Sequence, residues 1–308
     1  MLKTFKIGGV HPPENKLSAQ GEIITLPLPE QVSIPLSQHI GAPAVPTVKK
    51  GDQVKVGQII GQAAGFISAN IHSSVSGTVM SLDPVIDASG YPRPAVTIKV
   101  EGDEWDENIL KDPINKQPGT FTKEEILAAI SAAGIVGMGG AGFPTGVKLS
   151  PKNQNIDYII INGSECEPYL TSDYRLMVER SKDIIEGISI VLRLFEKAEA
   201  IIGIEDNKPK AIDALSFECN GNNRINVMPL STRYPQGGER RLISSVTGRQ
   251  INSHILPADA GVIVLNIATI IAIYEAVKMN MPLVHRVVTL TGDGVNKPGN
   301  MDVLVGIS

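Results

Sequence analysis

Residues 137–148 read GMGGAGFPTGVK, and this glycine-rich stretch indicates what kind of domain surrounds it. Four of its first six residues are glycine, so the backbone can approach a flat or charged group with no side chain in between. Pro144 suits the first turn of a following helix, where its missing N–H costs nothing. A glycine-rich loop before a helix offers N–H donors to an anion, typically a phosphate. A tight turn between packed elements is the alternative.

Two familiar nucleotide-binding motifs do not account for this loop. Gly137, Gly139 and Gly142 match the GxGxxG pattern of dinucleotide-binding folds, but that pattern should follow a strand, and here a helix is predicted before it. The loop is not a Walker A motif either, because Phe143 stands where that motif requires a lysine.

The residues on both sides of the loop predict an α/β domain. Thr122 opens a helix over 123–133, Glu125 completes a capping box, and Gly134 is placed to end the helix. Apolar strand candidates and helical patterns then alternate, which predicts a parallel sheet covered by helices on both faces. The strand candidates are Tyr158–Ile161, Ala200–Ile204, Ile225–Met228 and Val262–Leu265, and the helical patterns are Asp173–Lys197, Pro209–Phe217, Gly238–Val246 and Ile267–Met279.

The residue pattern in the first third of the chain predicts β structure. Its turn glycines Gly51 and Gly57 surround alternating valines, a spacing that resembles the flattened barrel of biotinyl and lipoyl carrier domains. Those carriers present a modifiable lysine on a hairpin, but no lysine occurs between Lys55 and Lys99. We therefore expect a barrel-sandwich domain without a prosthetic arm. The β-rich pieces are Glu22–Leu28, Gln58–Gly61, Gly77–Leu82 and Ala95–Val100.

These patterns divide the chain into four parts. Residues 1–103 form the β-rich barrel-sandwich domain, residues 104–120 a polar linker, and residues 121–282 the α/β domain. Residues 283–308 predict a β-hairpin that begins another small domain. Because the sequence stops abruptly there, we expect it to be a truncated part of a longer protein.

Polar residues follow the first strand of the α/β domain, in the run Asn-Gly-Ser-Glu-Cys-Glu-Pro at 162–168. Ligands of open α/β sheets bind beyond the carboxyl ends of strands. Asn162, Glu165 and Glu167 could therefore hydrogen-bond a hydroxyl-rich group such as a ribityl or ribose chain. A general acid–base pair of carboxylates and a merely solvated turn are the alternatives.

Two more turns occur at the same edge of the predicted sheet. Tyr234–Glu239 reads YPQGGE and places Gly237 and Gly238 at a helix start, and Asn266–Thr269 follows the last strand. Each turn alone could be an ordinary helix cap. Four such turns on one side of one sheet favour a shared binding site.

Composition narrows the class of protein. The 308 residues carry 28 basic and 32 acidic side chains, a formal net charge of −4. We expect no nucleic-acid partner, because such proteins need a basic stripe to release counterions from phosphates. The longest uncharged apolar stretch, between Asp259 and Glu275, is shorter than the ~20 residues that span a bilayer. The two cysteines, Cys166 and Cys219, are too few for an iron–sulfur cluster, which takes about four thiolates, and no metal ligands are predicted.

At these motifs the sequence is similar to a known family. The segment 142–148 resembles the flavin loop of the NADH-binding flavoprotein subunit of respiratory complex I. The runs Asn162–Asp173 and Tyr234–Glu239 resemble more specifically the C subunit of the Rnf electron transport complex, an ion-translocating oxidoreductase. The barrel without its lysine fits that subunit too, and the resemblance covers nearly the whole chain.

The resemblance implies the fold and the cofactors. A biotinyl/lipoyl-like barrel-sandwich domain would precede a Rossmann-like α/β domain that binds FMN and NAD(H), and the C-terminal hairpin would begin a small β-grasp-like (SLBB) segment. The family also carries two cysteine-rich regions for [4Fe–4S] clusters, which are expected only beyond the residues present here. Ser164, Gly238 and Ala268 depart from complex I, which has acidic residues there.

The resemblance also implies roles for residues in all four loops. The FMN phosphate and the flavin or nucleotide edge would contact Gly137, Gly139, Gly140, Gly142 and Lys148. The ribityl region and NADH would contact Asn162, Glu165 and Glu167. The NADH side would be lined by Tyr234, Gly237, Gly238 and Glu239, with Asn266 and Thr269 near the phosphate. Hydride transfer to a flavin requires no side-chain acid or base, so no catalytic residue is implied.

The implied protein is an oxidoreductase subunit that exchanges electrons between NAD(H) and a ferredoxin-type carrier. It would lie peripherally on the cytoplasmic side of the cell membrane, with the other subunits of the complex as partners. A non-catalytic assembly module, whose barrel and hairpin dock those subunits, is the competing interpretation.

Overall fold

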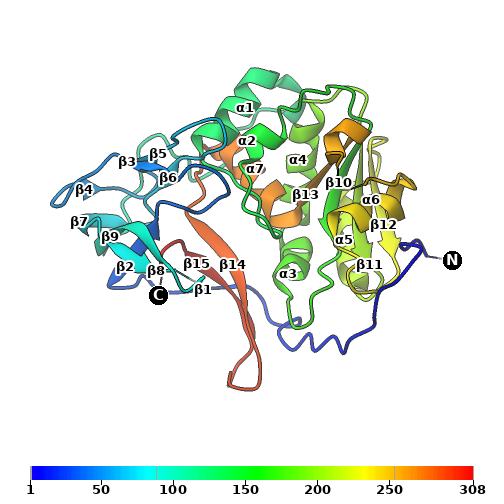
Figure 1. The fold of residues 1–308 in the computed structure, drawn as a ribbon, viewed down its shortest axis with the longest axis horizontal. Helices are drawn as coiled ribbons and strands as arrows, with labels where there is room; N and C mark the ends of the chain where they lie inside the picture. Colours follow the sequence, from blue (N-terminus) through cyan, green and yellow to red (C-terminus); the bar gives the residue numbers. More distant parts are fainter. Residues whose placement is uncertain (1, 88, 253, 308) are drawn as a thin grey trace.

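Four parallel strands form the central sheet, in the order β12-β11-β10-β13 (Figure 1). The structure is a computed structural model that describes residues 2–87, 89–252 and 254–307. The strands are β10 (Tyr158–Gly163), β11 (Glu199–Glu205), β12 (Ile225–Leu230) and β13 (Val262–Asn266). All four predicted strands are confirmed, and each is slightly longer than predicted.

Helices cover both faces of this sheet, as the sequence predicts. Ile159 and Ile161 are buried against α1, α3, α4, α5 and α7, whereas Ile160 is buried against α6 on the opposite face. Burial on both faces explains the continuous apolar strands. The helices are α1 (Lys123–Ala132), α2 (Thr145–Lys148), α3 (Ser172–Glu179), α4 (Ser181–Leu192), α5 (Pro209–Glu218), α6 (Glu239–Thr247) and α7 (Ile267–Met279), with 3-10 turns η1 (Pro118–Thr120) and η2 (Pro257–Ala260).

The predicted helix ends are mostly confirmed. Thr122 and Glu125 form the predicted capping box, with backbone-to-side-chain bonds of 3.1 and 2.8 Å. Gly134 follows α1 with a φ of 65°, the left-handed conformation that glycine adopts without strain.

Two local predictions are wrong. The helical pattern over Asp173–Lys197 is two helices, because Arg180 leaves helical geometry (φ −126°, ψ 31°) and its guanidinium bonds Asp183 and Glu275 at 2.7 and 2.6 Å. Pro144 lies just outside its helix as the N-cap of α2, which begins at Thr145.

The N-terminal β domain consists of two small sheets packed around an apolar core. One sheet has the order β2-β9-β7-β4 with β8 beside β9, and the other has the order β3-β5-β6. Val32, Ile34, Ile60 and Ile98 are buried between them. The strands are β2 (Gln31–Pro35), β3 (Val45–Pro46), β4 (Gln53–Val54), β5 (Ile59–Gln62), β6 (Ile71–His72), β7 (Ser76–Ser81), β8 (Pro84–Ile86) and β9 (Pro92–Gly102).

The C-terminal hairpin forms as predicted from antiparallel β14 (His285–Leu290) and β15 (Gly299–Leu304). A third strand joins it from the other end of the chain: β1 (Ile24–Thr25) pairs in parallel with β15. The strand predicted over Glu22–Leu28 is therefore shorter and pairs with the hairpin. Completion of a β-grasp-like segment stays a prediction.

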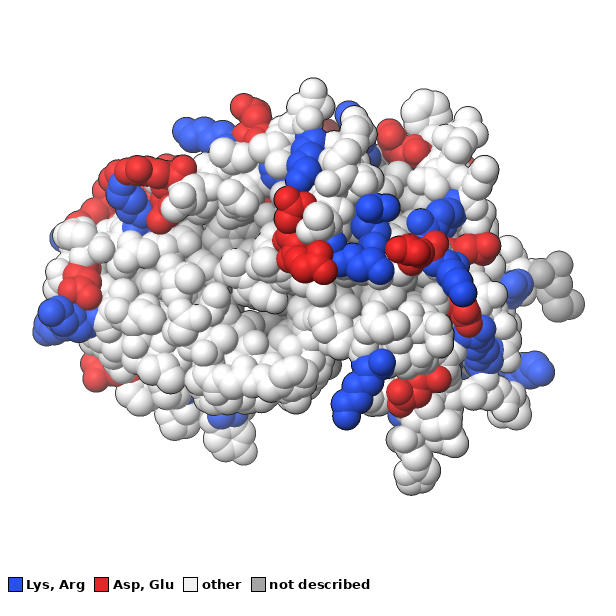
Figure 2. Space-filling model, turned by 90° about the horizontal axis from the view of Figure 1, so that it is seen from above, with Lys and Arg blue, Asp and Glu red and all other residues white. Residues whose placement is uncertain are grey.

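Direct contacts join the β domain to the rest of the molecule. The Ile40 N–H donates to Gly142 O at 2.7 Å, and the Ser74 hydroxyl donates to Val305 O at 2.6 Å. In Figure 1 the N-terminal segment runs along the lower edge, from the α/β sheet toward β1. Among the described residues, no helix has the length and apolar character needed to cross a bilayer. Basic and acidic side chains are intermixed on the face drawn in Figure 2.

Candidate functional site

The glycine loop, residues 137–142, is fixed at its base to α7 and to β14. The Gly137 N–H donates to Phe143 O at 2.9 Å, and the Met138 N–H donates to the Thr269 hydroxyl at 3.1 Å. The Arg286 guanidinium, from β14, donates to Met138 O. Thr269 lies in the first turn of α7, so the loop is anchored beside that helix N-terminus.

The tip of the glycine loop is exposed and presents free donors. Among the described residues, no protein acceptor bonds the N–H groups of Gly139, Gly140 or Ala141, and all three residues are exposed. A Cβ at Gly139 would meet Asn266 Cβ at 2.7 Å, whereas a Cβ at Gly140 would meet nothing within 4 Å. Gly139 therefore packs on the end of β13, and Gly140 borders open space.

Two asparagines connect the loops at the carboxyl edge of the sheet. Asn162 and Asn266 are register partners on β10 and β13. The Asn162 amide donates to Gly237 O at 2.8 Å, and Asn266 caps α7 while its amide donates to Asp173 Oδ2 at 2.6 Å. The loops predicted from sequence to share one site therefore lie together.

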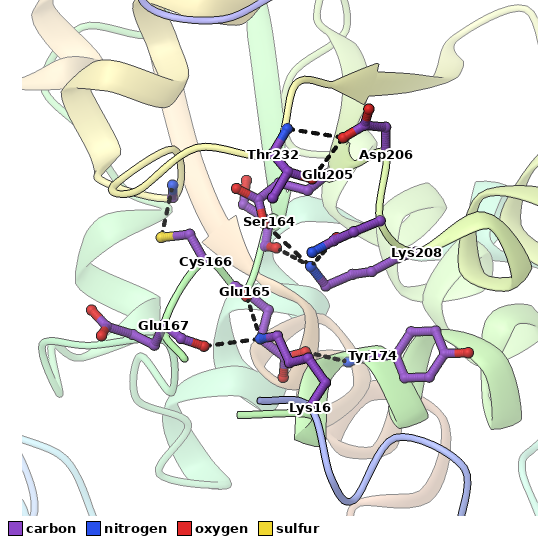
Figure 3. Close-up of polar contacts among 12 residues, drawn as sticks. Lys16, Ser164, Glu165, Cys166, Glu167, Tyr174, Glu205, Asp206, Lys208 and Thr232 are labelled. Carbon is purple, nitrogen blue, oxygen red and sulfur yellow. Dashed lines mark hydrogen bonds and ion pairs between the residues drawn. The ribbon is translucent and has the colours of Figure 1, made fainter. Parts of the chain in front are cut away.

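The acidic turn, residues 164–170, follows β10 and carries a partly buried carboxylate (Figure 3). The Glu165 carboxylate accepts the N–H groups of Asp173 and Tyr174 at 2.7 and 3.3 Å. Burial, with the nearby Asp173 carboxylate, raises the pKa of Glu165 to about 7. Burial likewise raises the pKa of Asp173 to about 6, although the bond from Asn266 opposes that shift.

Two lysines bond main-chain carbonyls of the acidic turn (Figure 3). Lys208 is buried, and its ammonium donates to Ser164 O at 2.7 Å and to Glu205 Oε2 at 3.3 Å. Lys16 reaches the same turn from the N-terminal segment and donates to Glu165 O at 2.9 Å. The Ser164 hydroxyl is fully buried and has no partner among the described residues.

Four of the remaining predicted residues form two side-chain pairs, Lys148 with Glu239 and Tyr234 with Glu167. The Lys148 ammonium contacts Glu239 Oε1 at 3.0 Å. A hydrogen bond to Glu167 raises the pKa of Tyr234. Tyr234 also lines a cavity of about 250 Å³ beside the acidic turn, over the ends of β11 and β12. Within the part of the chain that the structure describes, no group of three or more His, Cys, Asp or Glu side chains is arranged to hold a metal ion.

Sequence reasoning missed four residues of this site: Lys16, Asp173, Lys208 and Arg286. Lys208 follows the predicted strand end Ile204 by four residues, so the strand-end rule could have suggested it, and Asp173 lies in the run Asn162–Asp173 that carries the family resemblance. Lys16 and Arg286 come from segments outside the α/β domain, and neither carries a local signal of its contact.

Two family models match successive parts of the chain. Residues 3–103 match the RnfC barrel sandwich hybrid domain, and residues 130–275 match the Nuo51 FMN-binding domain. The second match contains the glycine loop, the acidic turn and the N-terminus of α7.

Similar curated proteins match along nearly the whole chain. The C subunit of the proton-translocating ferredoxin:NAD(+) oxidoreductase complex of Clostridium ljungdahlii is 45% identical over 99% of this chain and 66% of its own length. The Na(+)-translocating counterpart of Acetobacterium woodii is 41% identical, over 99% of this chain and 68% of its own length. The C subunit of the ion-translocating oxidoreductase complex of Rhodobacter capsulatus is 43% identical over 99% of this chain and 59% of its own length. The chain thus spans about three fifths to two thirds of these relatives.

Solved structures agree on the fold. Crystal structures of an NAD+-reducing [NiFe]-hydrogenase, in the air-oxidized and H2-reduced states, superpose with a TM-score of 0.52 each. The air-oxidized structure is 24% identical and covers 59% of this chain and 36% of its own chain. The H2-reduced structure is 22% identical and covers 62% of this chain and 38% of its own chain. Such identities bear on fold alone. The two family models and the curated relatives lead to one assignment: the chain belongs to the RnfC family, the C subunits of ion-translocating oxidoreductase complexes.

Proposed function

We propose that this chain binds FMN and NAD(H) and forms the electron-entry part of an ion-translocating NAD(H):ferredoxin oxidoreductase complex. The observation that carries the proposal is the exposed tip of the glycine loop, whose N–H groups have no acceptor among the described residues and lie beside Asn266 at the carboxyl edge of the sheet. Such a tip suits a phosphate, because backbone N–H groups and a helix N-terminus both favour an anion.

The residues present fit FMN. The tip at Gly139–Ala141 offers free donors for a phosphate, and Gly140 leaves room for close approach. The Ser164 hydroxyl is a buried polar group that no described residue bonds, of the kind that a ribityl hydroxyl satisfies. Asn162 and Glu165 lie on the same side and would contact the ribityl region.

The other predicted residues would serve the nicotinamide nucleotide. Gly237 lies next to Asn162. The NADH side would be lined by Glu167, Gly237, Gly238 and Glu239, with Tyr234 adjacent. Lys148 is paired with Glu239 and would lie at the edge of the flavin or nucleotide. Because Gly237 and Gly238 lack side chains, they would let two flat rings stack at about 3–3.5 Å.

FMN would supply the chemistry, accepting a hydride and releasing electrons singly. The chain's own residues would position both nucleotides and set the electrostatic field, and we assign no catalytic acid or base. Electrons would leave through [4Fe–4S] clusters outside the present residues, toward a ferredoxin-type carrier. The names of its relatives support a place beside the other subunits of such a complex. The subunit would sit peripherally, on the cytoplasmic side of the membrane.

An anaerobic titration tests the proposal. The purified protein is added to FMN, and binding is followed by quenching of flavin fluorescence and by the visible absorption spectrum. NADH is then added, and bleaching of the flavin absorbance is expected. Flavin that stays fluorescent in the presence of excess protein would contradict the proposed function. Bound flavin that NADH fails to bleach would contradict its NADH part.

A further inference from the structure

The N-terminal arm, residues 10–18, crosses the underside of the acidic turn although it lies outside the FMN-binding match at 130–275. The Tyr169 N–H donates to Glu14 O at 2.8 Å. The hydroxyls of Ser18 and Thr171 hydrogen-bond at 2.6 Å. The arm thus contacts the turn through main-chain and side-chain atoms near its C-terminal end.

Lys16 makes the most extensive of these contacts. Its ammonium donates to three main-chain carbonyls of the acidic turn. Two are Glu165 O and Glu167 O, each at 2.9 Å (Figure 3). The third is Leu170 O at 2.7 Å. An ammonium has three donors and no acceptor, so these bonds satisfy it completely. The three carbonyls span six residues of the turn, and all three bond the same ammonium group.

The acidic turn needs such a fixing point because its backbone is strained. Glu165 and Tyr169 both adopt positive φ, at 46° and 68°, a conformation that side-chain-bearing residues rarely adopt. Such conformations persist only where surrounding contacts hold them. Lys16 bonds the carbonyl of the first strained residue, and the arm carbonyl Glu14 O bonds the N–H of the second.

The charges around Lys16 agree with a partly buried structural cation. Burial lowers the pKa of Lys16, while Glu165, Glu205 and Glu14 oppose that shift and Lys208 adds to it. In return, Lys16 and Lys208 both lower the pKa of Glu165 against its burial. The arm therefore affects both the backbone of the turn and the charge of the carboxylate that it carries.

We propose that Lys16 is a positioning residue of the flavin site, which holds the acidic turn in its binding conformation by coordinating three of its carbonyls. The proposal rests on the proposed FMN function and extends the site beyond the α/β domain. The Lys16 ammonium acts through the backbone of the turn, and its side chain also lines the cavity beside the turn. Its removal lets the turn relax from the conformation in which Asn162, Ser164 and Glu165 face the flavin.

The test compares Lys16→Met with a matched control. Lys3 lies in the same N-terminal segment and also donates to a main-chain carbonyl, Val246 O at 3.3 Å, but this carbonyl belongs to α6 and not to the acidic turn. In Lys16→Met, FMN binding is expected to weaken at least about tenfold, because charged hydrogen bonds are lost. Amide hydrogen exchange in residues 164–170 is expected to accelerate similarly. Lys3→Met should bind FMN and exchange these amides like the wild type.

Further outcomes separate the two proposals. Wild-type-like FMN affinity and exchange in Lys16→Met would overturn the role of Lys16. A wild type that binds no FMN would overturn the proposed function, while the exchange data would still decide whether Lys16 orders the turn. Lys16→Arg retains the charge but has a planar fork that cannot converge on three carbonyls, so it should stay impaired. Full rescue by Lys16→Arg would overturn coordination as the cause.

Discussion

Gly139 and Gly140 are adjacent, yet a side chain at each would meet different surroundings. At Gly139 it would collide with Asn266, so a loss of function there would mix packing damage with blocked binding. At Gly140 it would meet no protein atom within 4 Å. Gly140→Val is therefore the sharper test of a ligand seat. We expect an unchanged thermal unfolding midpoint and at least about tenfold weaker FMN binding, measured by fluorescence quenching.

Gly294→Val provides the matched control for this substitution. A Cβ at Gly294, in the β14–β15 hairpin, also meets nothing within 4 Å. That variant should fold and bind FMN like the wild type. Normal FMN binding by Gly140→Val would show that the tip of the glycine loop is not the flavin seat, whereas the assembly-module interpretation predicts that neither wild type nor variant binds FMN.

Glu165 makes stability depend on pH near neutrality. Its pKa in the folded protein is about 7, above the ordinary value of 4.5, so the folded state keeps a proton that the unfolded state releases. Its contribution to stability is fully present below about pH 4.5 and is lost as the pH rises through 7. Between about pH 5 and 7, the urea midpoint of the wild type should therefore fall more steeply with pH than the urea midpoint of Glu165→Gln.

The control for Glu165→Gln is Glu107→Gln, whose carboxylate lies in a separate segment with its side chain 92% exposed. It is expected to retain the wild-type slope of stability against pH. Identical slopes in wild type and Glu165→Gln would show that the turn leaves this carboxylate ordinarily solvated.

At the scale of elements, local patterns predicted the α/β domain well. The helix over Ile267–Met279 was predicted with its observed bounds, because Asn266 caps it and an apolar run fills it. The break at Arg180 could not be predicted, because it depends on Glu275, which lies 95 residues further along the chain. Likewise, nothing local to Ile24 indicates that its partner is Met301. Local signals fix helices and buried strands, whereas distant partners decide where they break and pair.

The same division applies to the candidate site. The glycine loop and the strand-end turns were predictable because parallel strands bring their carboxyl ends to one edge. Lys16 was not predictable, because a lysine between Asn15 and Leu17 in a polar segment resembles any solvated residue. Only the path of the N-terminal arm across the molecule places it beneath Glu165. The assignment of individual ligand contacts stays a prediction.

At the scale of the whole molecule, a charged cluster joins the C-terminal hairpin to the α/β domain. His285 on β14 contacts Asp302 on β15 at 2.8 Å and Glu275 on α7 at 3.7 Å. Arg180, between α3 and α4, bonds the other oxygen of Glu275 at 2.6 Å. Although burial alone would lower it, these carboxylates raise the pKa of His285 to about 10. Protonated His285 thus links three segments that lie far apart in sequence.

This linkage predicts an alkaline loss of stability. Because the folded pKa lies above the ordinary value of 6.5, the contribution of His285 is complete below 6.5 and disappears as the pH rises through about 10. His285→Gln should lower the free energy of unfolding by more than about 1 kcal/mol at neutral pH, and the two proteins should converge in alkaline solution. Urea unfolding across this range measures the difference. His254→Gln, at an exposed histidine, should follow the wild type throughout. A constant gap between wild type and His285→Gln at every pH would mean that packing, not charge, holds the hairpin against α7.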